Sequence, residues 1–228
     1  MKLSAEEVSE WNRTLRSKTA EEILEWAIEH ADGQVLVSTS FGPYAAVMLH
    51  LCTRIRPEIP VLWVDHGYNR PSTYRHVEEL KRRLNLNLKP YLPLVSAAHR
   101  DAIHGPVPGP DHEEALRQFS AAMKLEPFQR GVRELAPRVW LTAVRRVQNE
   151  NRAQLDPVIL DANFDTLKVC PLLEWTDDRM ESYLQVHQLP NEWDYFDPAK
   201  ADDHRECGLH AAWGGRVREV EDLKGGGI

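Results

Sequence analysis

The stretch DDHRECGLH, residues 202–210, contains one of the three cysteines in this 228-residue chain. A cysteine reacts as its thiolate, and nearby positive charge favours that form. Arg205 and His210 can supply such charge to Cys207, whereas three acidic residues in the same stretch oppose it. Cys207 is therefore a candidate nucleophile. Two alternatives stay open. Cys207 could be an incidental exposed thiol, or it could bind zinc together with His204 and His210, although the stretch lacks the second Cys/His pair typical of structural zinc sites.

Basic side chains gather in a second place, the segment AVRRVQNENR. Guanidinium groups match the oxygens of phosphate and sulfate, and a buried one needs such a partner. The segment therefore predicts an anion site, with a solvated surface patch as the alternative. The candidates are Arg145, Arg146, Gln148 and Arg152, joined by Arg130 and Lys168 from neighbouring segments.

Two further segments follow apolar runs and carry small or polar residues. Hydroxyl groups and a glycine between a strand and a helix can hold an anion, although neither GxGxxG nor a Walker motif is present. A carboxylate after the next strand can accept from an amino group or a ribose hydroxyl. A plain tight turn and a turn-capping aspartate are the alternatives. The candidates are Ser38, Thr39, Ser40, Phe41 and Gly42, then Asp65, Gly67 and Tyr68.

The composition restricts the class of protein. A net charge of −7 argues against broad binding to nucleic acid or anionic membranes. No apolar run reaches the roughly 18 residues of a membrane span, and the first residues lack the apolar core of a signal peptide. Three widely spaced cysteines indicate reduced thiols and a cytoplasmic protein. Cys52 and Cys170 lie in apolar segments and are expected in the core.

Apolar β-branched runs alternate with helical patterns along the chain. This alternation predicts an α/β fold with a doubly wound, mostly parallel sheet of five to six strands, in which ligands bind beyond the carboxyl ends of the strands. We expect an α/β domain over residues 1–190 and a C-terminal tail over 191–228. The predicted strands are 34–40, 60–65, 87–94, 138–144 and 165–173; the predicted helices are 5–16, 20–31, 43–55, 71–84, 125–135 and 177–188.

Taken together and in this order, the motifs resemble those of the sulfonucleotide reductase family, most closely its members that act on 3′-phosphoadenylyl sulfate (PAPS). The resemblance covers most of the chain, from about residue 38 to residue 210. The matching stretches are STSFGPYAAVMLHL, which resembles a modified PP-loop, LWVDHGYNRPSTY, KLEPFQRGVREL, AVRRVQNENRAQL, LKVCPLLEW and RECGLH, which resembles the signature that holds the catalytic cysteine.

The resemblance implies a PP-loop fold of the adenine nucleotide hydrolase type and a reaction in assimilatory sulfate reduction. Cys207 would attack the sulfur of PAPS, expel adenosine 3′,5′-bisphosphate and become S-sulfocysteine. Reduced thioredoxin or glutaredoxin would then release sulfite. The isolation of Cys207 fits a second thiol that comes from a partner. The tail would have to be mobile, and a homodimer is possible within the family.

Three departures from the family bear on the substrate. Members that act on adenylyl sulfate (APS) usually carry cysteine pairs for a four-iron cluster, and the three scattered cysteines here predict no cluster and no metal. The segment NEWDYFDPAKADDH is short and acidic, and NEN stands in the arginine segment where relatives carry small residues. The alternatives are APS reduction without a cluster, a PP-loop ATP pyrophosphatase, and a non-catalytic nucleotide-binding redox sensor.

Overall fold

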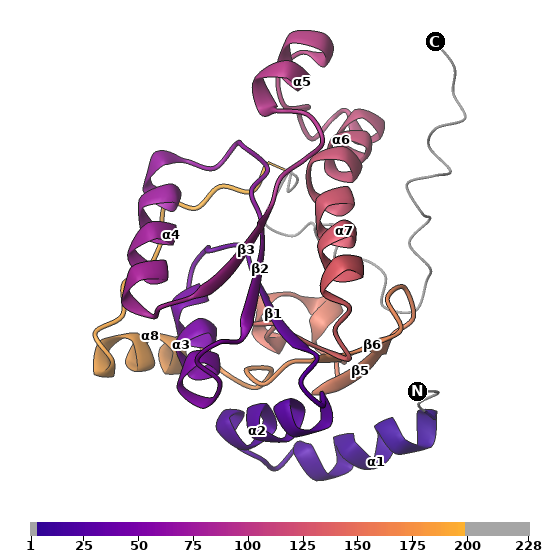
Figure 1. Ribbon diagram of the computed structural model, residues 1–228, viewed down its shortest axis with the longest axis vertical. Coiled ribbons are helices and arrows are strands. Elements are labelled where there is room, and N and C mark those ends of the chain that lie inside the picture. The colour runs from indigo at the N-terminus through magenta and orange to yellow at the C-terminus, as the bar shows by residue number, and fades with distance from the viewer. Residues whose placement is uncertain (1–3, 199–228) are drawn as a thin grey trace.

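A six-stranded sheet forms the centre of the computed structural model, which describes residues 4–198 (Figure 1). The strand order is β3-β2-β1-β4-β6-β5, and every neighbouring pair is parallel except β5 with β6. The predicted α/β class with a mostly parallel, doubly wound sheet is therefore confirmed. The strands are β1 (Val35–Thr39), β2 (Pro60–Val64), β3 (Asn87–Tyr91), β4 (Val139–Leu141), β5 (Val158–Asp161) and β6 (Thr166–Val169).

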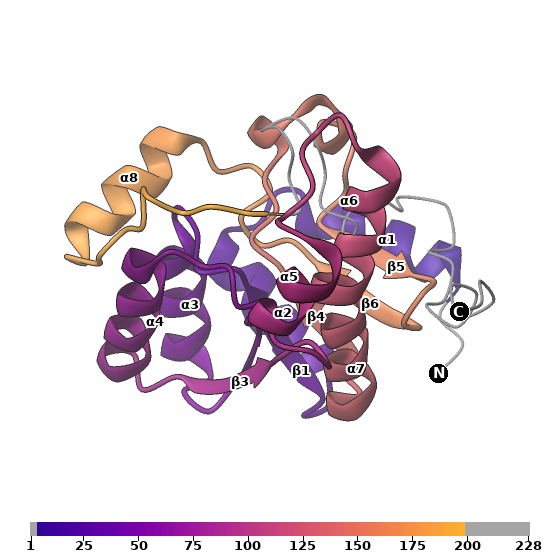
Figure 2. The same ribbon diagram turned by 90° about the horizontal axis from the view of Figure 1, so that it is seen from above.

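Helices cover both faces of the sheet (Figure 2). Residues alternate between the faces along each strand. Val35 and Val37 face the core shared with α2, α3, α4 and α8, whereas Leu36 and Trp140 pack against α7. The helices are α1 (Ala5–Leu15), α2 (Ala20–His30), α3 (Ala45–Ile55), α4 (Pro71–Arg83), α5 (Ala97–His104), α6 (Glu113–Ser120), α7 (Glu126–Leu135) and α8 (Asp177–Val186), with a π-helical turn at Ala121–Leu125.

The topology brings two loops together. The chain passes from β1 outward through β2 to β3, and then crosses to the other side of β1 to form β4. Val35 pairs with Val139 and Val37 with Leu141 across the β1–β4 seam. The switch point of the sheet therefore lies between β1 and β4, and the loops that follow these two strands meet at its carboxyl end.

Several elements differ from those expected. β5 had no predicted counterpart because its apolar run is short; it forms a hairpin with β6 in which Asp161 Oδ1 accepts from the backbone N–H groups of Asn163 and Phe164. The sequence predicts no element between residues 94 and 125, where α5 and α6 form; α5 begins with the Ser96 hydroxyl accepting from the backbone N–H of His99. β6 ends at Val169, earlier than expected.

Within residues 4–198, no helix is long and apolar enough to cross a membrane. Residues 191–198 lie against the carboxyl end of the sheet. Residues 199–228 of the predicted tail (191–228) lie outside the described residues, so the division at 190 and the mobility of the tail stay predictions.

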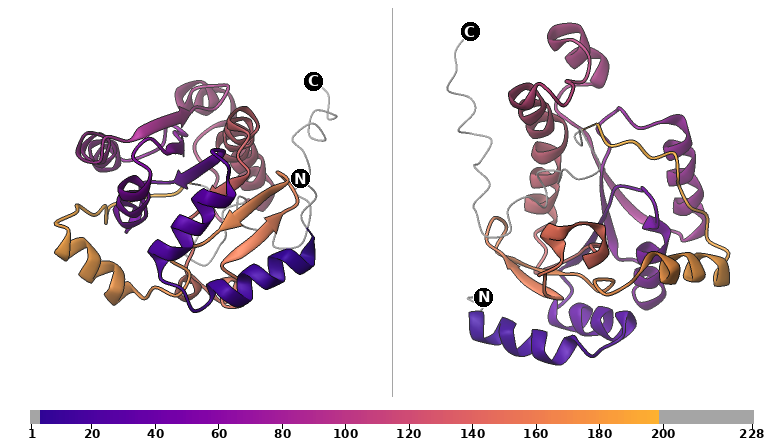
Figure 3. Two further views of the ribbon diagram at one scale, coloured as in Figure 1. Left: turned by 60° about the horizontal axis from the view of Figure 1, so that its bottom comes forward. Right: turned by 180° about the vertical axis from the view of Figure 1, so that it is seen from behind.

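The outer edge of β5 is covered by α1 (Figure 3). The Asn12 side chain is buried; its Nδ2 donates to the carbonyl of Val158 and its Oδ1 accepts from the backbone N–H of Val158, both at 2.8 Å. The Asn12 side-chain amide thus forms hydrogen bonds with the backbone N–H and carbonyl of Val158, which would otherwise be unpaired at the edge of the sheet. Nearby, an exposed ion pair joins Arg16 to Asp156.

We therefore expect Asn12→Ala to lower the free energy of unfolding by about 2–4 kcal/mol, because it leaves two buried backbone groups unpaired. Urea denaturation measures this change. Arg16→Ala, the matched control, should cost about 0–1 kcal/mol because its ion pair is exposed. Equal effects of the two substitutions would contradict the role assigned to Asn12.

Candidate active site

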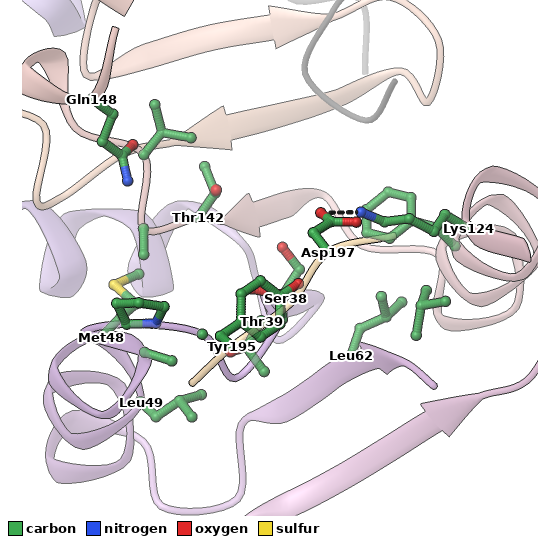
Figure 4. A pocket seen from close by; sticks show the side chains of 18 of the residues that line it. Ser38, Thr39, Met48, Leu49, Leu62, Lys124, Thr142, Gln148, Tyr195 and Asp197 are labelled. Carbon is green, nitrogen blue, oxygen red and sulfur yellow. Dashed lines mark hydrogen bonds and ion pairs between the residues drawn. The ribbon is translucent and has the colours of Figure 1, made fainter. Parts of the chain in front are cut away.

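A cavity of about 220 Å³ lies at the carboxyl end of the β1–β4 seam (Figure 4). The loops after both strands line it, together with α3, the π-helical turn before α7 and residues 195–197. Polar and apolar side chains share the lining. The polar members are Ser38, Thr39, Ser40, His66, Asn69, Lys124, Thr142, Gln148, Arg152, Tyr195 and Asp197; the apolar members include Met48, Leu49, Leu62, Val64, Phe128 and Trp140.

The loop after β1 supplies the predicted hydroxyl groups. Ser38, Thr39, Ser40 and Gly42 line the cavity, as the sequence pattern would require of an anion-binding loop. Ser38 Oγ accepts a hydrogen bond of 2.7 Å from Trp140 Nε1, which ties the β1 loop to β4.

Phe41 has a different place from the rest of this loop. Its side chain is fully buried and meets the ring of Trp63 edge-on, and it does not contribute to the cavity lining. Its φ of 55° turns the loop, and its backbone N–H donates to Thr39 Oγ1. Phe41 therefore anchors the loop that carries the hydroxyl groups.

Gly42 is required by close packing. A Cβ atom at this position would lie 2.9 Å from Cδ1 of Tyr195, so only glycine lets the Tyr195 ring lie over the loop. This contact joins the β1 loop to a segment more than a hundred residues later in the chain.

The three predicted residues after β2 form a turn beside the cavity. Asp65 Oδ1 accepts from the Gly67 backbone and from the Tyr74 hydroxyl, and Gly67 has a φ of 79°. The Tyr68 hydroxyl donates to Asp101 at 2.6 Å. These contacts match the turn-capping alternative, and none of the three side chains is part of the cavity lining.

The residue between them, His66, lines the cavity and was missed in the sequence because histidine in a turn carries no distinct signal. The backbone N–H of Tyr68 donates to His66 Nδ1 at 3.1 Å, so the neutral ring carries its proton on Nε2. Burial lowers the pKa of His66 to about 4, and the charge of Lys124 acts in the same direction. His66 is thus a neutral donor at pH 7.

The arginine segment divides into two parts. Gln148 and Arg152 line the cavity and are hydrogen bonded to each other. Arg145 is buried, donates to Asp177 at 2.8 Å and lies over the Tyr44 ring. Arg146 pairs with Glu174 at 2.7 Å. Carboxylates at and before the start of α8 therefore hold Arg145 and Arg146, while Gln148 and Arg152 face the cavity.

Arg130 and Lys168, the two other predicted basic residues, are outside the cavity lining. Arg130 pairs with Glu126 at 2.9 Å and donates to the carbonyl of Leu92. Lys168 is buried on β6, with Nζ 4.3 Å from the centre of the Trp140 ring on the neighbouring strand β4.

The other polar lining residues that sequence reasoning missed are Asn69, Lys124, Thr142, Tyr195 and Asp197, of which Lys124 and Asp197 are charged. Lys124 Nζ lies 2.6 Å from Asp197 Oδ2 inside the cavity, and both side chains are 7% exposed (Figure 4). The motif KLEPFQRGVREL contains Lys124, and its position before a helix start was the available signal. Asp197 lies in the acidic segment, where nothing in the pattern singles it out.

Cys207, Arg205 and His210 lie outside the described residues, so their predicted roles stay predictions. Cys52 and Cys170 are buried and free, as expected; burial raises the pKa of both thiols, that of Cys170 to about 11. Among residues 4–198, no group of three or more His, Cys, Asp or Glu side chains is arranged to hold a metal ion.

The fold and the cavity define an α/β protein with a cavity at the switch point of its sheet, lined by hydroxyl groups and basic side chains. The sequence model of the phosphoadenosine phosphosulfate reductase domain matches residues 34–193. The chain is similar to two relatives named phosphoadenosine 5′-phosphosulfate reductase. The relative from Synechocystis sp. is 37% identical over 86% of this chain and 87% of the relative. The relative from Xanthomonas campestris pv. campestris is 40% identical over 82% of this chain and 76% of the relative. The PAPS reductase of Candida auris, solved as a phosphate complex, shares the fold (TM-score 0.73, 23% identity, 84% of this chain, 91% of that chain).

The chain therefore belongs to the phosphoadenosine phosphosulfate reductase family. It is a nucleotide-binding sulfonucleotide reductase, an oxidoreductase of sulfate assimilation. The resemblance found in the sequence motifs is confirmed.

The neutral state of His66 predicts a pH dependence of stability. An unfolded chain protonates histidine near pH 6.5, whereas folded His66 stays neutral to about pH 4. The free energy of unfolding should therefore be unaffected by His66 above pH 6.5 and fall by roughly 2–3 kcal/mol as the pH drops from 6.5 to 4. In urea denaturation across this pH range, the free energy of unfolding of His66→Gln should fall by roughly 2–3 kcal/mol less than that of the wild type. His99→Gln, at an exposed position, is the control; identical pH profiles for His66→Gln and the wild type would contradict the assignment.

Proposed function

We propose that the protein reduces PAPS to sulfite and adenosine 3′,5′-bisphosphate in the cytoplasm, using thioredoxin or glutaredoxin as electron donor. The observation that carries this proposal is the meeting of the β1 hydroxyl loop, the Gln148–Arg152 pair and Lys124 in one cavity of a chain that belongs to the family. A polyanionic nucleotide needs this combination of donors and cations, and Met48 and Leu49 add apolar surface suited to a base.

The described residues supply binding. Ser38, Thr39 and Ser40 offer hydroxyl donors to phosphate oxygens, and Gly42 lets the backbone approach them closely. Arg152 is held by Gln148, so its guanidinium is in place before the ligand arrives. His66 offers a neutral Nε2–H that adds a donor without adding charge.

The proposed chemistry is two displacements at sulfur. The Cys207 thiolate attacks the sulfonate sulfur and forms an S–S bond while the S–O bond to the nucleotide breaks, so adenosine 3′,5′-bisphosphate leaves with the electron pair. A thiolate of reduced thioredoxin then attacks Cys207 Sγ and expels sulfite. The second thiol of thioredoxin attacks the mixed disulfide, which regenerates the Cys207 thiolate and leaves oxidised thioredoxin.

The residues around the cavity support PAPS more than APS without excluding the latter. Lys124 and Arg152 line the cavity. A second phosphate on the ribose adds negative charge, which these two cations favour. APS reduction by the same two displacements is the alternative.

Sulfite release from PAPS and from APS, each with reduced thioredoxin and with reduced glutaredoxin, tests the proposal. We expect faster turnover of PAPS, complete loss of turnover in Cys207→Ser, and retention of turnover in the control Cys170→Ala, whose thiol is buried. No sulfite from either sulfonucleotide would contradict the proposal, and faster turnover of APS would overturn the substrate assignment.

Thiol reactivity gives a separate prediction. Burial raises the pKa of Cys52 and Cys170, so both should remain protonated and shielded from reagent at pH 7.5. Iodoacetamide should therefore add one group to the native protein, at Cys207, and three groups after denaturation. Peptide mass spectrometry locates the adduct. Rapid labelling of Cys52 or Cys170 in the native protein would count against this account.

A further inference from the structure

Residues 191–197, here called the strap, cross the carboxyl end of the sheet and contact three separate elements. The Asn191 side chain accepts from the backbone N–H of Tyr44 at 2.7 Å, which holds the strap to the start of α3. Asp194 accepts from Ser72 at 2.9 Å and pairs with Arg70, which holds it to α4. The ring of Trp193 meets that of Tyr44, and the guanidinium of Arg70 lies over the ring of Phe196.

Two side chains of the strap enter the ligand cavity. The Tyr195 ring lies over Gly42, on the loop that offers hydroxyl donors to an anion. Asp197 Oδ2 lies 2.6 Å from Lys124 Nζ, and both side chains are nearly buried. The strap thus covers the β1 loop with a ring and brings a carboxylate to a lysine of the same cavity (Figure 4).

A carboxylate in this position is unfavourable once an anionic nucleotide arrives. A buried ammonium group needs an anionic partner, and Asp197 provides one in the structure described. A phosphate or sulfonate at Lys124 would bring like charge next to Asp197 in a site of low dielectric, where repulsion is strong. The Tyr195 ring also occupies space directly over Gly42. The ligand and these two side chains therefore compete for the same part of the cavity.

We propose that Asp197 is a built-in competitor for Lys124, which an anionic ligand must displace together with Tyr195, so that Asp197 sets the affinity and anion selectivity of the site. The proposal rests on the proposed function only in taking the ligand to be an anionic nucleotide. The same displacement would move the strap whenever the cavity fills.

The opposite role for Asp197 gives the opposite result. If Asp197 stayed paired and oriented Lys124 toward the ligand, removing its charge would weaken ligand binding. If Asp197 competes, removing its charge strengthens binding. The sign of the change in the dissociation constant therefore decides between a competitor and a positioning residue.

Isothermal titration calorimetry with adenosine 3′,5′-bisphosphate and, separately, inorganic sulfate tests the competitor role. Asp197→Asn keeps the side-chain shape, and it should bind both probes more tightly by roughly 10- to 100-fold, the equivalent of one charge-assisted hydrogen bond. Asp156→Asn removes the same charge from an exposed surface pair and is the matched control, expected to change affinity by less than about threefold.

A double-mutant cycle guards against a merely structural effect. In a Lys124→Gln background the Asp197→Asn change should strengthen binding much less than it does with Lys124 present, because competition for the ammonium group is gone and only the repulsion between Asp197 and the ligand remains. Strengthening of equal size in both backgrounds overturns the proposal, as does equal or weaker binding of both probes by Asp197→Asn alone. Tighter sulfate binding without any binding of the bisphosphate would instead support the competitor and contradict the proposed nucleotide substrate.

Discussion

The pairing of β4 beside β1 is the constraint on which the site depends. It places the loop after β1 and the loop after β4 at one edge of the sheet, although about a hundred residues separate them in the chain. The hydrogen bond from Trp140 to Ser38 joins the two strands through their side chains at that edge. A change that shifted this register by one residue would send Trp140 to the other face and separate the hydroxyl loop from the arginine segment.

Local partners explain how a protein with net charge −7 holds buried and half-buried cations near the cavity. Arg145 and Arg146 are neutralised by Asp177 and Glu174 in the segment that leads into α8, and Lys168 lies against the Trp140 ring. Each cation therefore has a partner before any ligand is present, as the cost of burying charge requires. The cations that line the cavity, Arg152 and Lys124, are also held, by Gln148 and Asp197. Ligand binding exchanges partners rather than filling empty positions.

Much of this architecture follows from local pattern. The apolar β-branched runs of β1, β2 and β4 and the helical spacing between them predict a doubly wound sheet, and the switch-point rule then directs attention to residues 38–42 and 145–152. β5 could not be found in this way, because its pairing and its cover by Asn12 are tertiary contacts between distant segments. The distinction between Arg145, held by α8, and Arg152, in the cavity, depends likewise on where α8 starts. His66, Lys124 and Asp197 become site residues only through folding, since each lies in a segment that has an ordinary structural interpretation.

We propose that this chain reduces a sulfonucleotide through a covalent intermediate on Cys207. Intact-mass spectrometry after mixing the reduced protein with PAPS, in the absence of any other thiol, tests it most directly. The account predicts a gain of one sulfonate group, located at Cys207 by peptide mapping, that is lost when reduced thioredoxin is added. An unmodified mass with both PAPS and APS, under conditions in which the nucleotide binds, would contradict it.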